Sequence, residues 1–109
     1  MADQLAWLMD WYAAQCDGEW EHRYGVTIGT LDNPGWTLEI DLAGTPLESR
    51  DFEPVAHNIS PEEAIHGPSG NKNWWTCEVE ESVFKAFGGP RDLEAMIGLF
   101  REWLERSGT

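Results

Sequence analysis

Basic residues are scarce in this chain of 109 residues. Seven Lys and Arg residues stand against twenty Asp and Glu residues, which leaves a formal net charge of -13. A field of this sign repels nucleic acids and anionic lipids, and it steers cationic partners over a Debye length of about 8–10 Å. We therefore expect a basic partner and no binding to nucleic acid or membrane.

Cysteine and long apolar runs are also lacking. The two cysteines, Cys16 and Cys77, are too few for a dense disulfide framework and form no CxxC zinc pattern. No run reaches the roughly 18 apolar residues of a membrane-spanning helix. The first four residues, Met-Ala-Asp-Gln, are acidic where a signal peptide is basic. These absences predict a cytoplasmic protein in a reducing compartment.

The chain has no recognisable catalytic motif. His22 lies beside Glu21, an arrangement that can support acid–base catalysis, but a lone histidine after a helix more often caps a turn. Acidic residues follow Cys77 and disfavour its thiolate. Gly88 and Gly89 precede a predicted helix without the spacing of a phosphate-binding loop. We expect a protein that is not an enzyme and needs no cofactor.

Apolar sequence is sufficient for one core. Hydrophobic residues make up 41% of the chain and aromatic residues 12%, which suits a single domain over residues 1–109. Gly, Pro and Ser gather at residues 66–73, and this composition predicts a flexible surface loop.

Helical periodicity is clear near both ends of the chain. The N-terminal segment ends at Asp17-Gly18 and has one apolar face formed by Leu5, Leu8, Met9, Tyr12, Ala13 and Cys16. Trp7 and Trp11 form a neighbouring stripe that either widens this buried face or makes an aromatic ridge at its edge. The C-terminal helix stops at Ser107-Gly108, and its apolar face contains Leu93, Met96, Ile97, Phe100 and Leu104, with Trp103 beside them.

Alternation of period two predicts strands between the helices. Residues 24–42 form two runs joined by Asn33-Pro34-Gly35, which suits a type II turn and an antiparallel hairpin. Residues 52–56 contain Pro54 and predict an edge strand. Residues 60–63 carry the signature of a capped helical turn. In the last strand, residues 74–80, the side chains of Trp75, Cys77 and Val79 point inward.

This order of elements predicts an α+β domain: an antiparallel sheet of about four strands with the N-terminal and C-terminal helices packed on one face. The other face is then exposed, and alternation places Glu39, Asp41, Glu78 and Glu80 on it, with an exposed Trp74. If their strands are neighbours, the four carboxylates form a cross-strand acidic patch that attracts a cationic partner.

A second acidic block lies at residues 16–22, Cys-Asp-Gly-Glu-Trp-Glu-His, before Arg23, the first basic residue. One alternative is a small metal- or ligand-binding accessory domain that uses Asp17, Glu19, Glu21 and His22, although the spacing is not that of an EF-hand. Another alternative is a nucleic-acid mimic, whose acidic face imitates phosphates.

Residues 16–22 (CDGEWEH), 30–36 (TLDNPGW), 75–79 (WTCEV) and 100–103 (FREW) resemble the immunity protein 53 family. The resemblance runs in order along nearly the whole chain, and residues 61–72 look like an insertion. It implies a bacterial immunity protein, made beside a polymorphic toxin, that binds and blocks the toxin domain.

The charge of the chain agrees with this implied role. We expect stoichiometric occlusion of a basic toxin, with acids that pair with Lys or Arg and tryptophans that act as hot spots. The oligomeric state is left open. The predicted toxin-binding residues are Glu19, Trp20, Glu21, Glu39, Asp41, Trp74, Glu78 and Glu80.

Overall fold

The computed structural model describes residues 4–32, 34–60, 62–63 and 72–107. The elements follow one another as helix α1 (Gln4–Gln15), helix α2 (Trp20–Arg23), strands β1 (Val26–Leu31), β2 (Gly35–Asp41), β3 (Val55–His57), β4 (Trp75–Glu80) and β5 (Val83–Gly88), and helix α4 (Leu93–Ser107). None of the helices in these ranges has the length and apolarity needed to span a bilayer.

The five strands form one antiparallel sheet in the order β1-β2-β5-β4-β3. The α+β prediction is confirmed, with β5 as an additional central strand that the sequence did not reveal. Glu80 pairs with Val83, so β4 and β5 are joined by Glu81 and Ser82 alone. Both residues have positive φ, 52° and 63°, where such a turn normally carries Asn and Gly.

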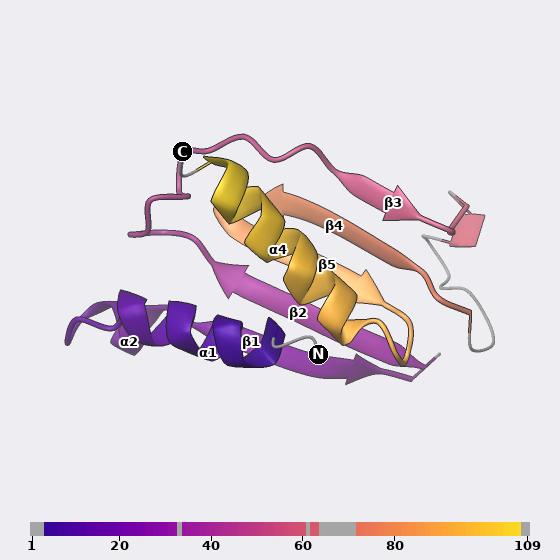
Figure 1. Ribbon diagram of the computed structural model, residues 1–109, viewed down its shortest axis with the longest axis horizontal. Helices are drawn as coiled ribbons and strands as arrows, with labels where there is room; N and C mark the ends of the chain where they lie inside the picture. The colour runs from indigo at the N-terminus through magenta and orange to yellow at the C-terminus, as the bar shows by residue number, and fades with distance from the viewer. Residues whose placement is uncertain (1–3, 33, 61, 64–71, 108–109) are drawn as a thin grey trace.

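Both long helices cover the same face of the sheet (Figure 1). Helix α4 crosses β2 and β5, and α1 packs beside it on the side of β1. The core between the layers is fully closed over the central strands. Its completely buried side chains are Leu38, Ile40, Leu42, Phe84, Ala86, Met96, Ile97 and Phe100.

Aromatic rings join the two helices to the sheet. Phe100 of α4 makes an edge-on contact with Trp11 of α1, at 5.1 Å between ring centroids, and lies 5.1 Å from Phe84 of β5. Trp103 and Trp36 donate their indole N–H groups to backbone carbonyls, each at 2.9 Å. Such rings supply large buried areas while their polar atoms keep hydrogen-bond partners.

Helix α1 is rotated relative to the predicted buried face. Leu8 and Trp11 are buried, whereas Leu5, Met9 and Tyr12 are 46%, 59% and 37% exposed. The prediction was wrong for the exposed stripe because α1 is apolar on more than one side, so periodicity alone could not choose between the sides. The tryptophan stripe takes the inner position, because its large rings reach Phe100.

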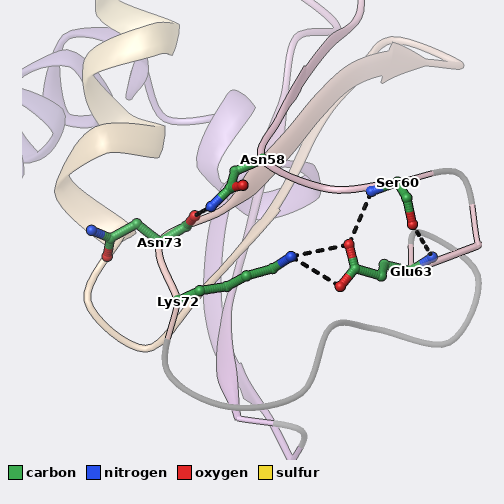
Figure 2. A network of polar contacts seen from close by, with 5 residues as sticks. All are labelled: Asn58, Ser60, Glu63, Lys72 and Asn73. Carbon is green, nitrogen blue, oxygen red and sulfur yellow. Dashed lines mark hydrogen bonds and ion pairs between the residues drawn. The ribbon is translucent and has the colours of Figure 1, made fainter.

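The predicted edge strand and capped turn are both present. Strand β3 begins directly after Pro54 and forms one edge of the sheet. In Figure 2, Ser60 Oγ accepts the Glu63 N–H at 3.1 Å, and a Glu63 carboxylate oxygen accepts the Ser60 N–H at 3.0 Å. Lys72 pairs with Glu63 at 2.9 Å and thereby lowers the pKa of that carboxyl. Of the loop predicted at residues 66–73, residues 66–71 lie outside the described part.

Candidate functional site

The acidic block after α1 forms a compact turn with reciprocal hydrogen bonds. Asp17 Oδ1 accepts the N–H groups of Glu19 and Trp20 at 3.0 and 2.9 Å, and these bonds, that of Trp20 first, lower the pKa of the Asp17 carboxyl. Glu21 accepts the N–H groups of Asp17 and Gly18, the shortest at 2.9 Å. Gly18 has a φ of 94°, which favours glycine. Much of this block therefore builds the corner between α1 and α2.

Trp20 is a core residue, with 6% of its surface exposed. Its ring packs edge-on against Trp11 at 6.2 Å, and its indole N–H donates to the Ala43 carbonyl at 2.8 Å. Because the ring is enclosed by the protein's own residues, the prediction that Trp20 contacts a partner is not supported. The block ties the helical corner to the loop after β2.

The metal-binding alternative is also not supported by the described residues. Within the described ranges, no group of three or more His, Cys, Asp or Glu side chains is placed to hold a metal ion. Asp17 and Glu21 direct carboxylate oxygens to backbone N–H groups of the turn, and His22 is exposed. The proposed ligands therefore do not converge.

Trp74 is buried, with 4% exposed, so the prediction of an exposed Trp74 was wrong. Strand β4 begins one residue later, at Trp75, and the alternation cannot be extended back to residue 74. The Trp74 N–H donates to the Asp92 carboxylate at 2.9 Å, and its carbonyl accepts the Gly89 N–H at 3.1 Å. These bonds hold Trp74 at the junction between β5 and α4.

The four predicted sheet carboxylates occupy the open face, but β5 separates their strands. Glu39 of β2 and Glu78 of β4 both pair in register with Lys85 of β5. Asp41 and Glu80 are likewise both opposite Val83. The predicted acidic patch is therefore divided by a cation, since β2 and β4 are not neighbours.

Lys85 organises the charges of this face. Its ammonium pairs with Glu80 at 3.0 Å, and this contact, with smaller effects of Glu39 and Glu78, raises the pKa of Lys85. Asp41 accepts the Gly25 N–H at 2.9 Å. Four carboxylates around one ammonium leave three net negative charges, and the exposed side chains of Glu39 and Glu78 stand on either side of it.

Sequence reasoning missed an apolar groove between α1 and β1. The groove has a volume of about 240 Å³. The signal for it was present, because α1 carries more apolar residues than one buried face requires. Ile28 of β1 pairs with the buried Leu38 and thus lies on the helix side of the sheet, yet it is 38% exposed here. The groove is lined by Leu5, Leu8, Met9, Tyr12, Gly25, Val26 and Ile28.

Cys77 is buried and is not placed to act as a nucleophile. Its side chain is 2% exposed on the inner side of β4, and burial raises its pKa to about 12. A thiol in this state stays protonated and packs as a small apolar group. The structure agrees with its expected packing role.

Residues 5–105 match the family described as Immunity protein 53, and the chain belongs to this family. No curated protein and no solved structure matched the chain. Members of an immunity protein family neutralise a cognate toxin of a polymorphic toxin system and are typically not catalytic. The partner implied for this chain is therefore a toxin domain.

Proposed function

We propose that this immunity protein acts in the cytoplasm as a stoichiometric inhibitor of a basic toxin domain, with the acidic open face of the sheet as part of its binding surface. The observation that carries the proposal is the set of four carboxylates on that face in a chain of net charge -13. Occlusion requires a complementary surface and no catalytic group.

Electrostatic complementarity supports rapid and tight association. Charge pairs across a known nuclease–inhibitor interface couple by about 1.5–7 kcal/mol, and long-range attraction raises association rates. The proposed contacts on the open face are Glu39, Asp41, Glu78 and Glu80, with Glu19 and Glu21 at the helical corner. On the open face Glu39 and Glu78 are exposed, whereas Glu80 is paired with Lys85 and Asp41 accepts the Gly25 N–H.

The nucleic-acid mimic is less well supported than a dedicated inhibitor. Such a mimic needs a run of negative charge without cations, whereas Lys85 lies at the centre of the open face. It also predicts that several unrelated DNA-binding proteins bind the chain, which a pull-down with a panel of such proteins would reveal.

The test uses the toxin domain encoded by the neighbouring gene. We expect the double variant Glu39→Lys with Glu78→Lys to slow association at least about tenfold at low salt, because attraction is replaced by repulsion. The matched control is Glu94→Lys with Glu102→Lys, an equal charge change on exposed residues of α4. Equal association of the two variants would contradict a role for the open face.

Protection of cells gives the second readout. Cells that express the toxin domain should survive with the wild-type chain and with the α4 control, and should survive less well with the open-face variant. If the wild-type chain neither binds the toxin domain nor protects cells, the proposed function itself fails.

A further inference from the structure

Strand β1 forms an edge of the sheet without the usual protection. It is the first strand in the sheet order, and its six residues, VTIGTL, include no charge and no proline. Natural edge strands are commonly blunted by charge, proline or short length. The opposite edge strand, β3, has only three residues and follows Pro54 (Figure 1). The β1 edge is therefore the one suited to pairing with another strand.

The hydrogen-bond pattern shows which groups of β1 face outward. The Asp41 N–H donates to the Gly25 carbonyl at 3.0 Å, which makes these residues a hydrogen-bonded pair. Bonded and non-bonded pairs alternate along an antiparallel ladder. The N–H and C=O groups of Val26, Ile28 and Thr30 thus point away from β2. Within the described ranges, no loop or turn backbone bonds to these groups.

The apolar groove lies along the same edge. Val26 and Ile28 share the helix side of the sheet, because they pair with Ile40 and Leu38 of the core. Helix α1 supplies the other wall with Leu5, Met9 and Tyr12, all exposed. A strand added to β1 would place every second side chain into this groove.

The surroundings of the groove are acidic. Residues 4–32 contain five acids, against Arg23 as the single Lys or Arg. Glu21 lies close enough to Tyr12 that its charge adds to the Cys16 interactions that raise the pKa of Tyr12. On the open face, Glu39 pairs with Thr27 of β1. Two copies of a chain with charge -13 repel each other, so this charge favours a cationic occupant over a second copy.

We propose that an extended segment of the toxin domain adds to β1 as a further strand, with apolar side chains in the groove and Lys or Arg side chains on the open face. The inference rests on the proposed function and locates the partner on the molecule. Adjacent strands lie about 4.8 Å apart, so a basic residue beside Thr27 is about 10 Å from the backbone of Glu39. Two extended side chains can meet across that distance.

One pair of variants tests the strand pairing at a single position. Thr30→Pro removes an outward N–H, whereas Thr30→Ala keeps it and shortens the same exposed side chain. The β1–β2 ladder keeps its bonds in both, because the Thr30 N–H faces away from β2. With the neighbouring gene's toxin domain as the probe, we expect Thr30→Pro to weaken binding about tenfold and Thr30→Ala less than about twofold.

A second pair tests the groove. Met9→Gln places a neutral polar side chain on its wall, and Ala14→Gln places the same side chain at another exposed position of α1. We expect about a tenfold loss of affinity for Met9→Gln and no significant loss for Ala14→Gln. The melting temperature of each variant shows that the fold is retained.

The outcomes separate the inference from the proposed function. If the wild-type chain does not bind the toxin domain, the proposed function fails. If it binds and both Thr30→Pro and Met9→Gln bind equally well, the function stands and the edge proposal is overturned. A dimer of the chain alone in sedimentation equilibrium that Thr30→Pro dissociates would identify a second copy as the occupant and would also overturn it.

Discussion

Helices α1 and α4 cover the same face of one sheet but bury their apolar residues to different extents. Helix α4 encloses Met96, Ile97 and Phe100 completely, whereas α1 leaves Leu5 and Met9 about half exposed. The difference follows position, since α4 lies across the central strands and α1 lies beside the edge strand β1 (Figure 1). We infer that α4 mainly stabilises the fold and that α1 also offers a surface to a partner.

The largest expected contrast is between Phe100 and Met9. Phe100→Ala removes a fully buried ring and should lower the free energy of unfolding by about 3–5 kcal/mol. Met9→Ala changes a side chain that is 59% exposed and should cost less than about 0.5 kcal/mol. Urea denaturation measures both values. Similar costs for the two variants would contradict the inference that α4 stabilises the fold more than the exposed side of α1 does.

The start of α4 is expected to be nearly as sensitive. The buried Asp92 carboxylate accepts the N–H groups of Trp74 at 2.9 Å and of Gly89 at 3.1 Å. Asp92→Ala leaves the Trp74 N–H without this acceptor, whereas the Gly89 N–H keeps the Trp74 carbonyl, so we expect a total cost of about 1–3 kcal/mol. Asp92→Asn keeps one acceptor oxygen and serves as the control, with a smaller loss expected in the same denaturation experiment.

A pH-dependent contribution is expected from Cys77. Burial raises its pKa from the ordinary value of 9.0 to about 12 in the folded protein. Above pH 9 the unfolded thiol loses its proton while the folded thiol keeps it, so the free energy of unfolding falls as pH rises from 9 to 12. The slope is about 1.4 kcal/mol per pH unit. Denaturation curves between pH 8 and pH 10 should show this component in the wild-type chain, and Cys77→Ala should lack it.

A smaller effect is expected at the corner between α1 and α2, where Trp20 lies. Trp20→Phe keeps a ring against Trp11 but removes the hydrogen bond to the Ala43 carbonyl, at an expected cost of about 1 kcal/mol. Binding of the toxin domain should change little, because Trp20 is buried. If Trp20→Phe reduced the affinity for the toxin domain much more than it reduced the free energy of unfolding, Trp20 would have to contact the toxin domain.

The parts of the fold that the sequence predicted have strong local signals. The β1–β2 hairpin follows from its two alternating runs, and the turn at Ser60 and Glu63 follows from their capping pattern. The predicted type II turn was wrong, because Gly35 belongs to β2, pairs with Leu31 and lacks the positive φ that such a turn requires. Strand β5 was missed because Glu81 and Ser82 adopt positive φ without the residues that normally signal such a turn. A turn can be predicted from sequence only where its residues have an intrinsic preference for the backbone angles of that turn.

The candidate site was harder to predict because it depends on contacts between distant residues. Alternation placed Glu39 and Glu78 on the open face but could not place Lys85 between them. Trp74 was assigned to the wrong environment, since its position depends on Asp92. The groove depends on which stripe of α1 packs against Phe100, and both stripes are apolar.

Hydrogen exchange of the chain, free and bound to the neighbouring gene's toxin domain, tests the distinction between α1 and α4 most directly. We predict slower exchange in the complex at the Val26, Ile28 and Thr30 amides, with little change at the exposed positions of α4. Slower exchange on the outer side of α4, with the β1 amides exchanging as in the free chain, would contradict the proposal that β1 and α1 contact the toxin domain.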